Sequence, residues 1–254
     1  MTTNLFFNKP QWGTVEHTDN YAIYYDSTAI DIDTVQDFSS APDFIFNSGR
    51  KVPSAWGNSS IDKSIVKIRN SIFFVKRYNC LGLTYKIKNM YRKSKALKSW
   101  ENGFRYREAG ISTPRPIICL EKRRSKLLGD SYLVCEHLDD AHNLLEIWHD
   151  LDAVTRIRYI RLAGIEIGHM HHMGFLHGDL NWRNIIIQKE SDHEKIYLVD
   201  LDGCYFSNHV NKKKACRDLK HFYRDLKRNK ASQGDIDAFQ QAWQKTYFND
   251  KTRP

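Results

Sequence analysis

The most informative stretch of this sequence is His177-Gly178-Asp179-Leu180-Asn181-Trp182-Arg183-Asn184, and Asp200-Leu201-Asp202-Gly203 follows it after an apolar segment. An acid and an amide on one loop, with a second acid at the end of a strand, are the groups that ATP-dependent phosphoryl transfer requires. We predict that Asp179 orients or deprotonates the acceptor hydroxyl. We also predict that Asn184 and Asp200 hold Mg²⁺ against the phosphates of ATP.

Other polar residues near this pattern allow more than one interpretation. Asp202 takes the place that glycine usually has, and it either supports the metal or is a turn residue. His177 is interpreted as a structural residue that braces the loop, rather than as a proton shuttle. Asp218 either anchors the loop from a following helix or is an exposed helix charge. Only two of three nearby histidines share a helix face, and no acid or cysteine accompanies them, so packing or surface roles are expected for His169, His171 and His172.

The composition is that of a soluble globular protein. Of the 254 residues, 41% are hydrophobic and 27% are charged, and no apolar run approaches the roughly 20 residues of a membrane span. The five cysteines are scattered and never spaced as C-x-x-C, which fits a reducing cytoplasm better than a disulfide framework or a zinc site. The N-terminus lacks the pattern of a signal peptide. The net charge of +9 favours an anionic partner, but charge alone does not choose between nucleic acid, a phosphate-bearing substrate and an acidic membrane.

Hydrophobic periodicity predicts the elements around the motif. A β-hairpin is expected from residues 64–68 and 71–78, which are rich in β-branched and aromatic side chains and are joined by Arg69-Asn70. Segment 93–109 predicts a helix that ends at Gly110. Further along the chain we expect strands at 117–120 and 131–135 around a basic loop at 121–130, a short helix at 144–148, a long helix at 153–173 that Gly174 caps, a strand-loop-strand at 176–199 and a helical tail at 212–247.

These elements predict an α+β, protein-kinase-like fold with two lobes. Residues 1–138 would form a small β-rich N-lobe with one helix, in which the first sixty residues predict short strands and loops. Residues 139–254 would form a larger, mostly helical C-lobe that carries the catalytic loop and the metal site. The two lobes are expected to close over a metal–nucleotide complex.

A lysine that meets the nucleotide phosphates is expected on the third strand of the small lobe, paired with a helix glutamate. Lys76 ends such a strand, and Glu101 lies on the helix that follows it. We predict that these two residues belong to the catalytic machinery and that Lys76 also binds the nucleotide. Glu108 lies on the same helix and is the competing candidate.

The remaining nucleotide contacts are predicted from two parts of the chain. Gly49 and segment 56–60 are the candidates for the phosphate-covering loop, although neither belongs to a G-x-G-x-x-G pattern. Segment 132–138 predicts a fifth strand that runs into an interlobe hinge. There the backbone of Glu136 and that of Leu138 would hydrogen-bond the adenine base.

Segment 85–98 is a basic run without a single acid. Such a run is usually a solvated face. Because Tyr85, Met90, Tyr91 and Leu97 are interleaved with the charges, the segment also fits an anionic lipid or phosphorylated glycan surface. Both interpretations stay open for its basic residues, which are Lys86, Lys88, Arg92, Lys93, Lys95 and Lys98.

From residue 65 to residue 226 the sequence resembles the lipopolysaccharide core kinases, the group of Kdo kinases and heptose kinases of Gram-negative bacteria, which share the protein-kinase-like fold. Besides loop 177–184, the resemblance is carried by Arg92-Lys93-Ser94-Lys95-Ala96-Leu97-Lys98-Ser99-Trp100-Glu101-Asn102 and by Ala109-Gly110-Ile111-Ser112-Thr113-Pro114-Arg115-Pro116. In addition, Asp200-Leu201-Asp202 is similar to the D-x-D that this group has in place of D-F-G.

The resemblance implies ATP and Mg²⁺ as cofactors, and transfer of the γ-phosphoryl group to a sugar hydroxyl of the inner core, with Kdo favoured and heptose next. It implies a lipopolysaccharide precursor (Kdo-lipid A or core oligosaccharide) as partner at the cytoplasmic face of the inner membrane, an anionic membrane surface and no nucleic acid. The sugar, its hydroxyl and the oligomeric state stay open, and the glycine loop departs from the family pattern. Site roles carry over by position to Lys76, Glu101, Asp179, Asn184 and Asp200.

Three rival functions fit the sequence less well. A protein Ser/Thr kinase would need a peptide-docking segment after Gly203, and no A-P-E-like sequence follows. An aminoglycoside- or choline-type phosphotransferase usually offers an acidic pocket to a cationic substrate, whereas this chain is basic. A catalytically inactive binding module is disfavoured because the chain retains Lys76, Asp179, Asn184 and Asp200 together.

Overall fold

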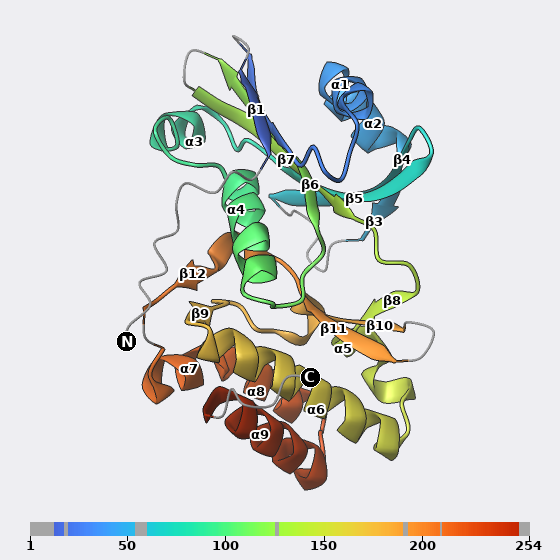
Figure 1. Cartoon of the computed structure of the whole chain (residues 1–254), viewed down its shortest axis with the longest axis vertical. Helices are drawn as coiled ribbons and strands as arrows, with labels where there is room; N and C mark the ends of the chain where they lie inside the picture. Colours follow the sequence, from blue (N-terminus) through green and yellow to red (C-terminus); the bar gives the residue numbers. More distant parts are fainter. Residues whose placement is uncertain are drawn as a thin grey trace. The chain divides into compact units, whose positions relative to one another are not determined.

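The computed structural model describes residues 13–17, 20–53, 60–124, 127–189, 193–208 and 210–248 (Figure 1). The chain divides into two compact units, of which the first comprises residues 1–101 and 116–136 and the second comprises residues 102–115 and 137–254. The last passage between the units therefore falls after Glu136, two residues before the predicted lobe boundary.

The first unit is built on a sheet that has, within the described residues, the order β1-β2-β6-β7-β5-β4-β3 with antiparallel neighbours. Its hairpin of β4 (Ile61–Ile68) and β5 (Ser71–Tyr78) confirms the predicted pairing, with Arg69 in the left-handed region (φ 53°) at the turn. The other strands are β1 (Thr14–His17), β2 (Tyr21–Tyr25), β3 (Arg50–Val52), β6 (Pro116–Arg124) and β7 (Leu127–Glu136).

Two helices, α1 (Ile32–Ser40) and α2 (Pro42–Ser48), pack on one face of this sheet (Figure 1). The carboxylate of Asp31 caps α1, and the proline at the start of α2 has no amide hydrogen to leave unpaired. The prediction of a single helix in this part of the chain, with strands and loops before residue 60, was therefore wrong for residues 32–48. The core on this face includes Val35, Phe38, Phe46, Val66, Val75, Ile118 and Val134.

The helix α4 (Lys95–Glu108) begins on the opposite face, where the Tyr78 hydroxyl and Ser99 Oγ are hydrogen-bonded at 3.2 Å. Successive side chains of a strand point to opposite faces of its sheet. Since Val75 belongs to the core of α1 and α2, the alternation places Lys76 on the face of α4 together with Tyr78.

The strands β6 and β7 are longer than predicted. They pair from Pro116↔Cys135 out to Arg124↔Leu127, so most of the basic loop expected at 121–130 is strand. Between β5 and α4 the chain forms the short helix α3 (Leu83–Lys88), which packs near β7, in a segment where the sequence predicted only a basic run.

The second unit contains, in its described residues, a sheet of order β11-β10-β8 and the separate pair β12-β9. It also contains the end of α4 and the helices α5 to α9. Its strands are β8 (Ala141–Asn143), β9 (Phe175–Leu176), β10 (Ile185–Lys189), β11 (Glu194–Leu198) and β12 (Tyr205–Phe206). Its helices are α5 (Leu144–Ile147), α6 (Ala153–His172), α7 (Lys212–Asp218), α8 (Lys220–Arg228) and α9 (Gln233–Phe248), and 3₁₀ turns cover Trp148–Asp150, Trp182–Asn184 and Leu201–Gly203.

The helices α6 and α9 pack closely against each other in this unit (Figure 1). A Cβ on Gly164 or on Gly168 would lie 2.8 Å from a carbonyl oxygen of α9, so only glycine permits this approach. The helix predicted at 153–173 is confirmed, and Gly174 follows it with a φ of +86°. The α+β class is confirmed as well. No helix in the described part of the chain is long and apolar enough to cross a membrane.

Candidate active site

The loop 177–184 leaves the short strand β9 in the second unit and turns sharply at Gly178. This glycine has a φ of +84°, and a Cβ there would lie 3.0 Å from the carbonyl oxygen of Gly203. A side chain at this position would be both strained and crowded. The turn therefore explains why glycine precedes Asp179.

Asp218, at the end of α7, holds this turn from its buried side. Its carboxylate accepts hydrogen bonds from the backbone N–H of His177 at 2.8 Å and of Gly178 at 2.7 Å, and its side chain is 4% exposed. Burial alone would raise the pKa of Asp218, but the hydrogen bond from His171 and the two backbone donors bring it below its ordinary value. The predicted anchoring role is confirmed, and the alternative of an exposed helix charge was wrong.

Two further side chains extend this anchor to the C-terminal helix. His171 Nε2 lies 3.0 Å from Asp218 Oδ2, and Trp243 Nε1 donates to His171 Nδ1 at 3.0 Å. Since Nδ1 accepts, Nε2 carries the hydrogen that Asp218 accepts. This role of His171 was not predicted from the sequence. In the described residues, no group of three or more His, Cys, Asp or Glu side chains could hold a metal, so His169, His171 and His172 form no such site.

His177 is completely buried and braces the loop, as predicted. Its Nε2 is 3.0 Å from the carbonyl oxygen of Val199, and its Nδ1 accepts from the backbone N–H of Asp179 at 3.4 Å. Burial lowers the pKa of His177 below its ordinary value, although the carboxylates of Asp218, Asp200 and Asp179 act in the opposite direction. A neutral imidazole with its hydrogen on Nε2 makes both contacts.

The structure brings together the three residues that the motif singled out in this unit. Asn184 Nδ2 donates to the carbonyl oxygen of Asp179 at 2.9 Å. The strands β10 and β11 pair Ile185 with Leu198, and the backbone N–H of Val199 donates to the carbonyl oxygen of Asn184 at 3.0 Å. Asn184 and Asp200 therefore lie at the same end of two paired strands.

The backbone of Asp200 is unusual, because it adopts the left-handed conformation with φ 71° and ψ 57°. Residues other than glycine hold this conformation at a cost of order 1–2 kcal/mol, and such positions cluster at functional sites. Asn102 fixes the turn that follows by donating from Nδ2 to the carbonyl oxygens of Leu201 at 2.8 Å and of Cys204 at 3.0 Å. The role of Asn102 was not predicted, because the sequence shows an amide next to Glu101 but neither its burial nor its partners.

The donor set fits a magnesium site. Carboxylate and amide oxygens are the ligands that Mg²⁺ prefers, usually with substrate phosphates and water completing the octahedron. Asn184 is 6% exposed, and because its Nδ2 donates to Asp179, its Oδ1 is the end of the amide that remains for a cation. Asp200, at the same end of the paired strands, would supply a carboxylate. Asp202, which is half-buried, follows in the 3₁₀ turn Leu201–Gly203, and its support of the metal stays a prediction.

His221 was not predicted from the sequence either. This residue lies on α8, and its Nδ1 is 2.6 Å from Oδ1 of Asp179. Asp225, one turn later on the same helix, accepts the backbone N–H of Trp182 at 2.9 Å. The spacing of His221 and Asp225 on an amphipathic helix was the available signal, but it does not say which loop the helix contacts.

In the first unit, Lys76 is 7% exposed on the face of the sheet that α4 covers. Its neighbours in the same row of that face are Leu133 of β7 and Cys119 of β6. Burial raises the pKa of the nearby Cys135 thiol to about 12, with Lys76 acting against this, so the thiol stays protonated at neutral pH. A buried cation among apolar groups and thiols is a suitable contact for an anionic ligand.

Glu101, expected to pair with Lys76, accepts hydrogen bonds from Lys93 Nζ at 2.5 and 2.8 Å. Lys93 lies just before α4, in the basic run. The pairing of Glu101 with Lys76 stays a prediction, and so do their catalytic roles. The competing Glu108 is exposed near the end of α4.

The other predicted nucleotide contacts lie at element ends. Gly49 follows α2, where a Cβ would come within 2.6 Å of Ile65 O and Val66 Cγ1, so packing against β4 already accounts for this glycine. Residues 54–59, which include most of the second loop candidate, lie outside the described residues. Glu136 ends β7, and Leu138 follows it before β8. Their contacts with adenine remain predictions.

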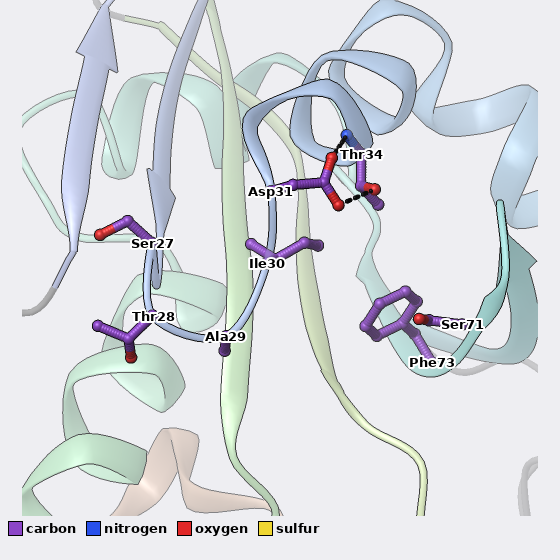
Figure 2. Close-up of a pocket in the computed structure, with 8 residues that line it drawn as sticks. All are labelled: Ser27, Thr28, Ala29, Ile30, Asp31, Thr34, Ser71 and Phe73. Carbon is purple, nitrogen blue, oxygen red and sulfur yellow. Dashed lines mark hydrogen bonds between the residues drawn. The ribbon is translucent and has the colours of Figure 1, made fainter.

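A pocket of about 380 Å³ lies away from these residues, at the start of α1 in the first unit (Figure 2). Asp31 is one of the residues that line the pocket. Its carboxylate accepts hydrogen bonds from the backbone N–H and the hydroxyl of Thr34, each at 2.8 Å. These bonds form the helix cap. Since the sequence places no expected site residue here, we assign the pocket no role.

The fold is shared with a solved structure described as "WaaP in complex with acyl carrier protein", with a TM-score of 0.55, 19% identity and coverage of 81% of this chain and 79% of that chain. This likeness shows that the two proteins share a fold. The family model "Lipopolysaccharide kinase (Kdo/WaaP) family" matches residues 83–243. The chain belongs to this family, which confirms the resemblance read from the sequence.

Among curated proteins the chain is similar to several 3-deoxy-D-manno-octulosonic acid kinases. It is 37% identical over 101 residues to that of Vibrio vulnificus (strain YJ016), a match that spans 39% of either chain. It is 28% identical over 173 residues to that of Vibrio cholerae, covering 65% of this chain and 69% of the relative. The chain thus matches about two fifths of the length of its Vibrio vulnificus relatives.

Proposed function

We propose that this protein is an ATP-dependent kinase that transfers the γ-phosphoryl group to a hydroxyl of 3-deoxy-D-manno-octulosonic acid (Kdo) in the lipopolysaccharide inner core, with heptose as the next candidate acceptor. The observation that carries the proposal is the grouping of Asp179, Asn184 and Asp200 at one end of the paired strands β10 and β11. The similarity to Kdo kinases supports the choice of acceptor.

In the proposed reaction Asp179 accepts the proton of the acceptor hydroxyl as the hydroxyl oxygen forms a bond to the γ-phosphorus. The bond from that phosphorus to the bridging oxygen of ATP breaks, and ADP leaves. Asn184 and Asp200 would hold Mg²⁺, which would supply positive charge beside the phosphates. Lys76 binds phosphate oxygens and is positioned by Glu101. The backbone of the residues between β7 and β8 holds adenine, at Glu136 and Leu138, and the segment from Gly49 onwards covers the phosphates.

One assay tests the proposal. The purified chain is incubated with γ-labelled ATP, with and without MgCl₂, and with Kdo-lipid A, heptosylated core, casein or an aminoglycoside. Metal-dependent labelling of Kdo-lipid A is expected, with heptosylated core next. Labelling of casein alone would establish a protein kinase, and labelling of the aminoglycoside alone would establish a small-molecule phosphotransferase. Absence of labelling in every arm would favour a binding module.

We further propose that the protein acts at the cytoplasmic face of the inner membrane and contacts anionic lipid through α3 and its flanks. Four large apolar side chains are exposed there, by 56–82% of their surface. Exposed apolar groups beside a basic run are the combination that binds to anionic bilayers. We call this surface the α3 surface, and it consists of the apolar residues Leu81, Leu83, Ile87 and Tyr91 with the exposed basic residues Arg92, Lys93, Lys95 and Lys98.

Sedimentation with vesicles of phosphatidylglycerol and phosphatidylcholine tests the α3 surface. Replacing Leu83 and Ile87 by Ser should reduce binding to anionic vesicles, and neutralising Lys93, Lys95 and Lys98 should reduce it as well. Phe44→Ser is the matched control, because Phe44 is 74% exposed on α2. Unchanged binding in the α3 variants would make segment 85–98 a plain solvated face.

A further inference from the structure

The carboxylate of Asp179 has one defined contact that the family motif does not account for. His221 Nδ1 lies 2.6 Å from Asp179 Oδ1, and the two side chains are 37% and 53% exposed. Both residues belong to the second unit, on α8 and on the loop after β9. The contact therefore joins the candidate base to a helix that follows it by about forty residues.

The main chain of Asp179 is held by other groups. Its N–H donates to His177 Nδ1, and its carbonyl oxygen accepts from Asn184 Nδ2 at 2.9 Å and from the backbone N–H of Asn181 at 2.9 Å. These bonds fix where the residue lies but leave rotation about its side-chain bonds. A half-exposed carboxylate without a further partner would sample several orientations.

The helix α8 is well placed to supply that partner. Phe222 is completely buried, and the Asp225 carboxylate accepts the backbone N–H of Trp182, within the same loop. One face of α8 is thus fixed to the loop after Asp179. His221 is carried by this face and reaches Asp179 from a rigid element, which gives precise orientation to a reactive group.

We propose that His221 is the positioning residue of the candidate base: its Nδ1–H donates to Oδ1 of Asp179, which fixes the carboxylate so that Oδ2 faces the acceptor hydroxyl. This role rests on the proposed kinase function. His221 itself does not touch the reacting atoms. The proton of the hydroxyl passes to Oδ2 of Asp179, while the Oδ1 contact persists through the transfer.

Three substitutions separate this role from a general need for a side chain at position 221. The amide nitrogen of Asn lies near the position of Nδ1, whereas that of Gln lies near Nε2. We expect His221→Leu to lower kcat by about 10- to 100-fold with the KM for ATP unchanged, because loss of orientation slows the chemical step. His221→Gln should behave like Leu, and His221→Asn should recover most of the rate.

His149→Asn is the matched control, because His149 is an exposed histidine of the same unit that contacts Asn229 rather than the loop. It should retain the wild-type rate. Equal rates of His221→Leu and wild type on Kdo-lipid A would overturn the proposal. Equal losses in the Asn, Gln and Leu variants, with unchanged thermal unfolding, would also overturn it, because they would show no dependence on a donor at Nδ1.

The tautomer of His221 gives a second readout that does not need activity. Long-range ¹H–¹⁵N NMR of the full chain should show the hydrogen of neutral His221 on Nδ1, and Asp179→Ala should move it to Nε2. A hydrogen on Nε2 in the unmodified protein would sink the proposal. If the wild type labels no sugar acceptor, the proposed function fails, and the rate of ATP hydrolysis to water in the same variants still tests His221.

Discussion

The loop of the second unit and the β5–α4 region of the first unit hold their functional side chains differently. In the loop, buried carboxylates of Asp218 and Asp225 accept backbone N–H groups, so the main chain itself is fixed. In the β5–α4 region, the contact found for Glu101 is an ion pair with Lys93, whose side chain is 54% exposed.

This difference suggests that a sequence motif predicts contacts to the backbone more reliably than ion pairs between long side chains. A bond to the backbone depends little on the identity of the residue that donates it, and it places a whole loop. A pair of long side chains can exchange partners at little cost, because exposed ion pairs contribute about 0–1 kcal/mol. If the two regions differ in this way, substitutions in the loop should have larger effects than substitutions in the β5–α4 region.

The largest effect is expected at the reactive side of the loop. Asp179→Ala should lower kcat for sugar phosphorylation by about 10³-fold while leaving thermal unfolding unchanged, because in the proposed function the half-exposed carboxylate acts on the acceptor. Steady-state kinetics with Kdo-lipid A measure this. Undiminished turnover would remove Asp179 from catalysis.

Asp200→Ala should instead abolish magnesium-dependent nucleotide binding in a titration with labelled ADP.

The next effect is expected at the buried side of the loop. Asp218→Ala should lower the free energy of unfolding by about 3 kcal/mol, because two backbone donors and His171 lose their acceptor in the interior. Urea titration followed by circular dichroism measures this loss. The control is Asp150→Ala, which removes an exposed carboxylate of the same unit. A change below about 0.5 kcal/mol would contradict the anchoring role.

A smaller effect concerns pH. Burial lowers the pKa of His177 in the folded state, so as the pH falls below about 6.5 the unfolded state binds a proton that the folded state does not. Stability from this residue is therefore present above its unfolded pKa and is lost on acidification toward the folded pKa. Urea titrations from about pH 7 to pH 5 should show this slope, and His177→Gln should reduce it. If the free energy of unfolding depends on pH equally in the His177→Gln protein and the wild type, residues other than His177 cause the acid sensitivity.

The smallest effect is expected in the first unit. Lys93→Ala should change the free energy of unfolding by only about 0.5 kcal/mol, because the pair with Glu101 is partly exposed. If Glu101 then serves Lys76, the KM for ATP should stay the same or fall. Lys76→Ala serves as the comparison, because the proposed function assigns Lys76 to the nucleotide phosphates. A KM for ATP as high in the Lys93→Ala protein as in the Lys76→Ala protein would mean that Lys93 supports the nucleotide site directly.

Much of the fold and of the loop could be predicted because it depends on local patterns. The β4–β5 hairpin follows from β-branched residues around a turn, and α6 follows from apolar periodicity that ends at Gly174. The proximity of Asn184 to Asp200 follows from two apolar strands with polar ends. In the first unit, Asp31 and Pro42 are residues that often begin a helix, and they begin α1 and α2. The segments that follow them are short and contain many polar residues, so the sequence indicated loops instead.

The missed residues depend on tertiary contacts. His221 reaches Asp179 across 42 positions, His171 reaches Asp218 across 47, and Asn102 reaches Leu201 and Cys204 across 99 and 102. Neither spacing nor residue type identifies the partner of such a side chain. The partner of Glu101 was predicted from the family pattern, whereas the basic segment before α4 supplies a nearer cation at Lys93. Whether Glu101 pairs with Lys93 or with Lys76 depends on how the side chains pack, and a sequence motif does not determine this packing.

Product analysis tests the central claim most directly. After incubation of the purified chain with ATP, MgCl₂ and Kdo-lipid A, mass spectrometry of the isolated lipid and of its Kdo fragment shows where phosphate has been added. We predict one added phosphate, on the Kdo fragment, and none with the Asp179→Ala protein. Phosphate on the lipid A fragment, or equal product from the Asp179→Ala protein, would contradict the account.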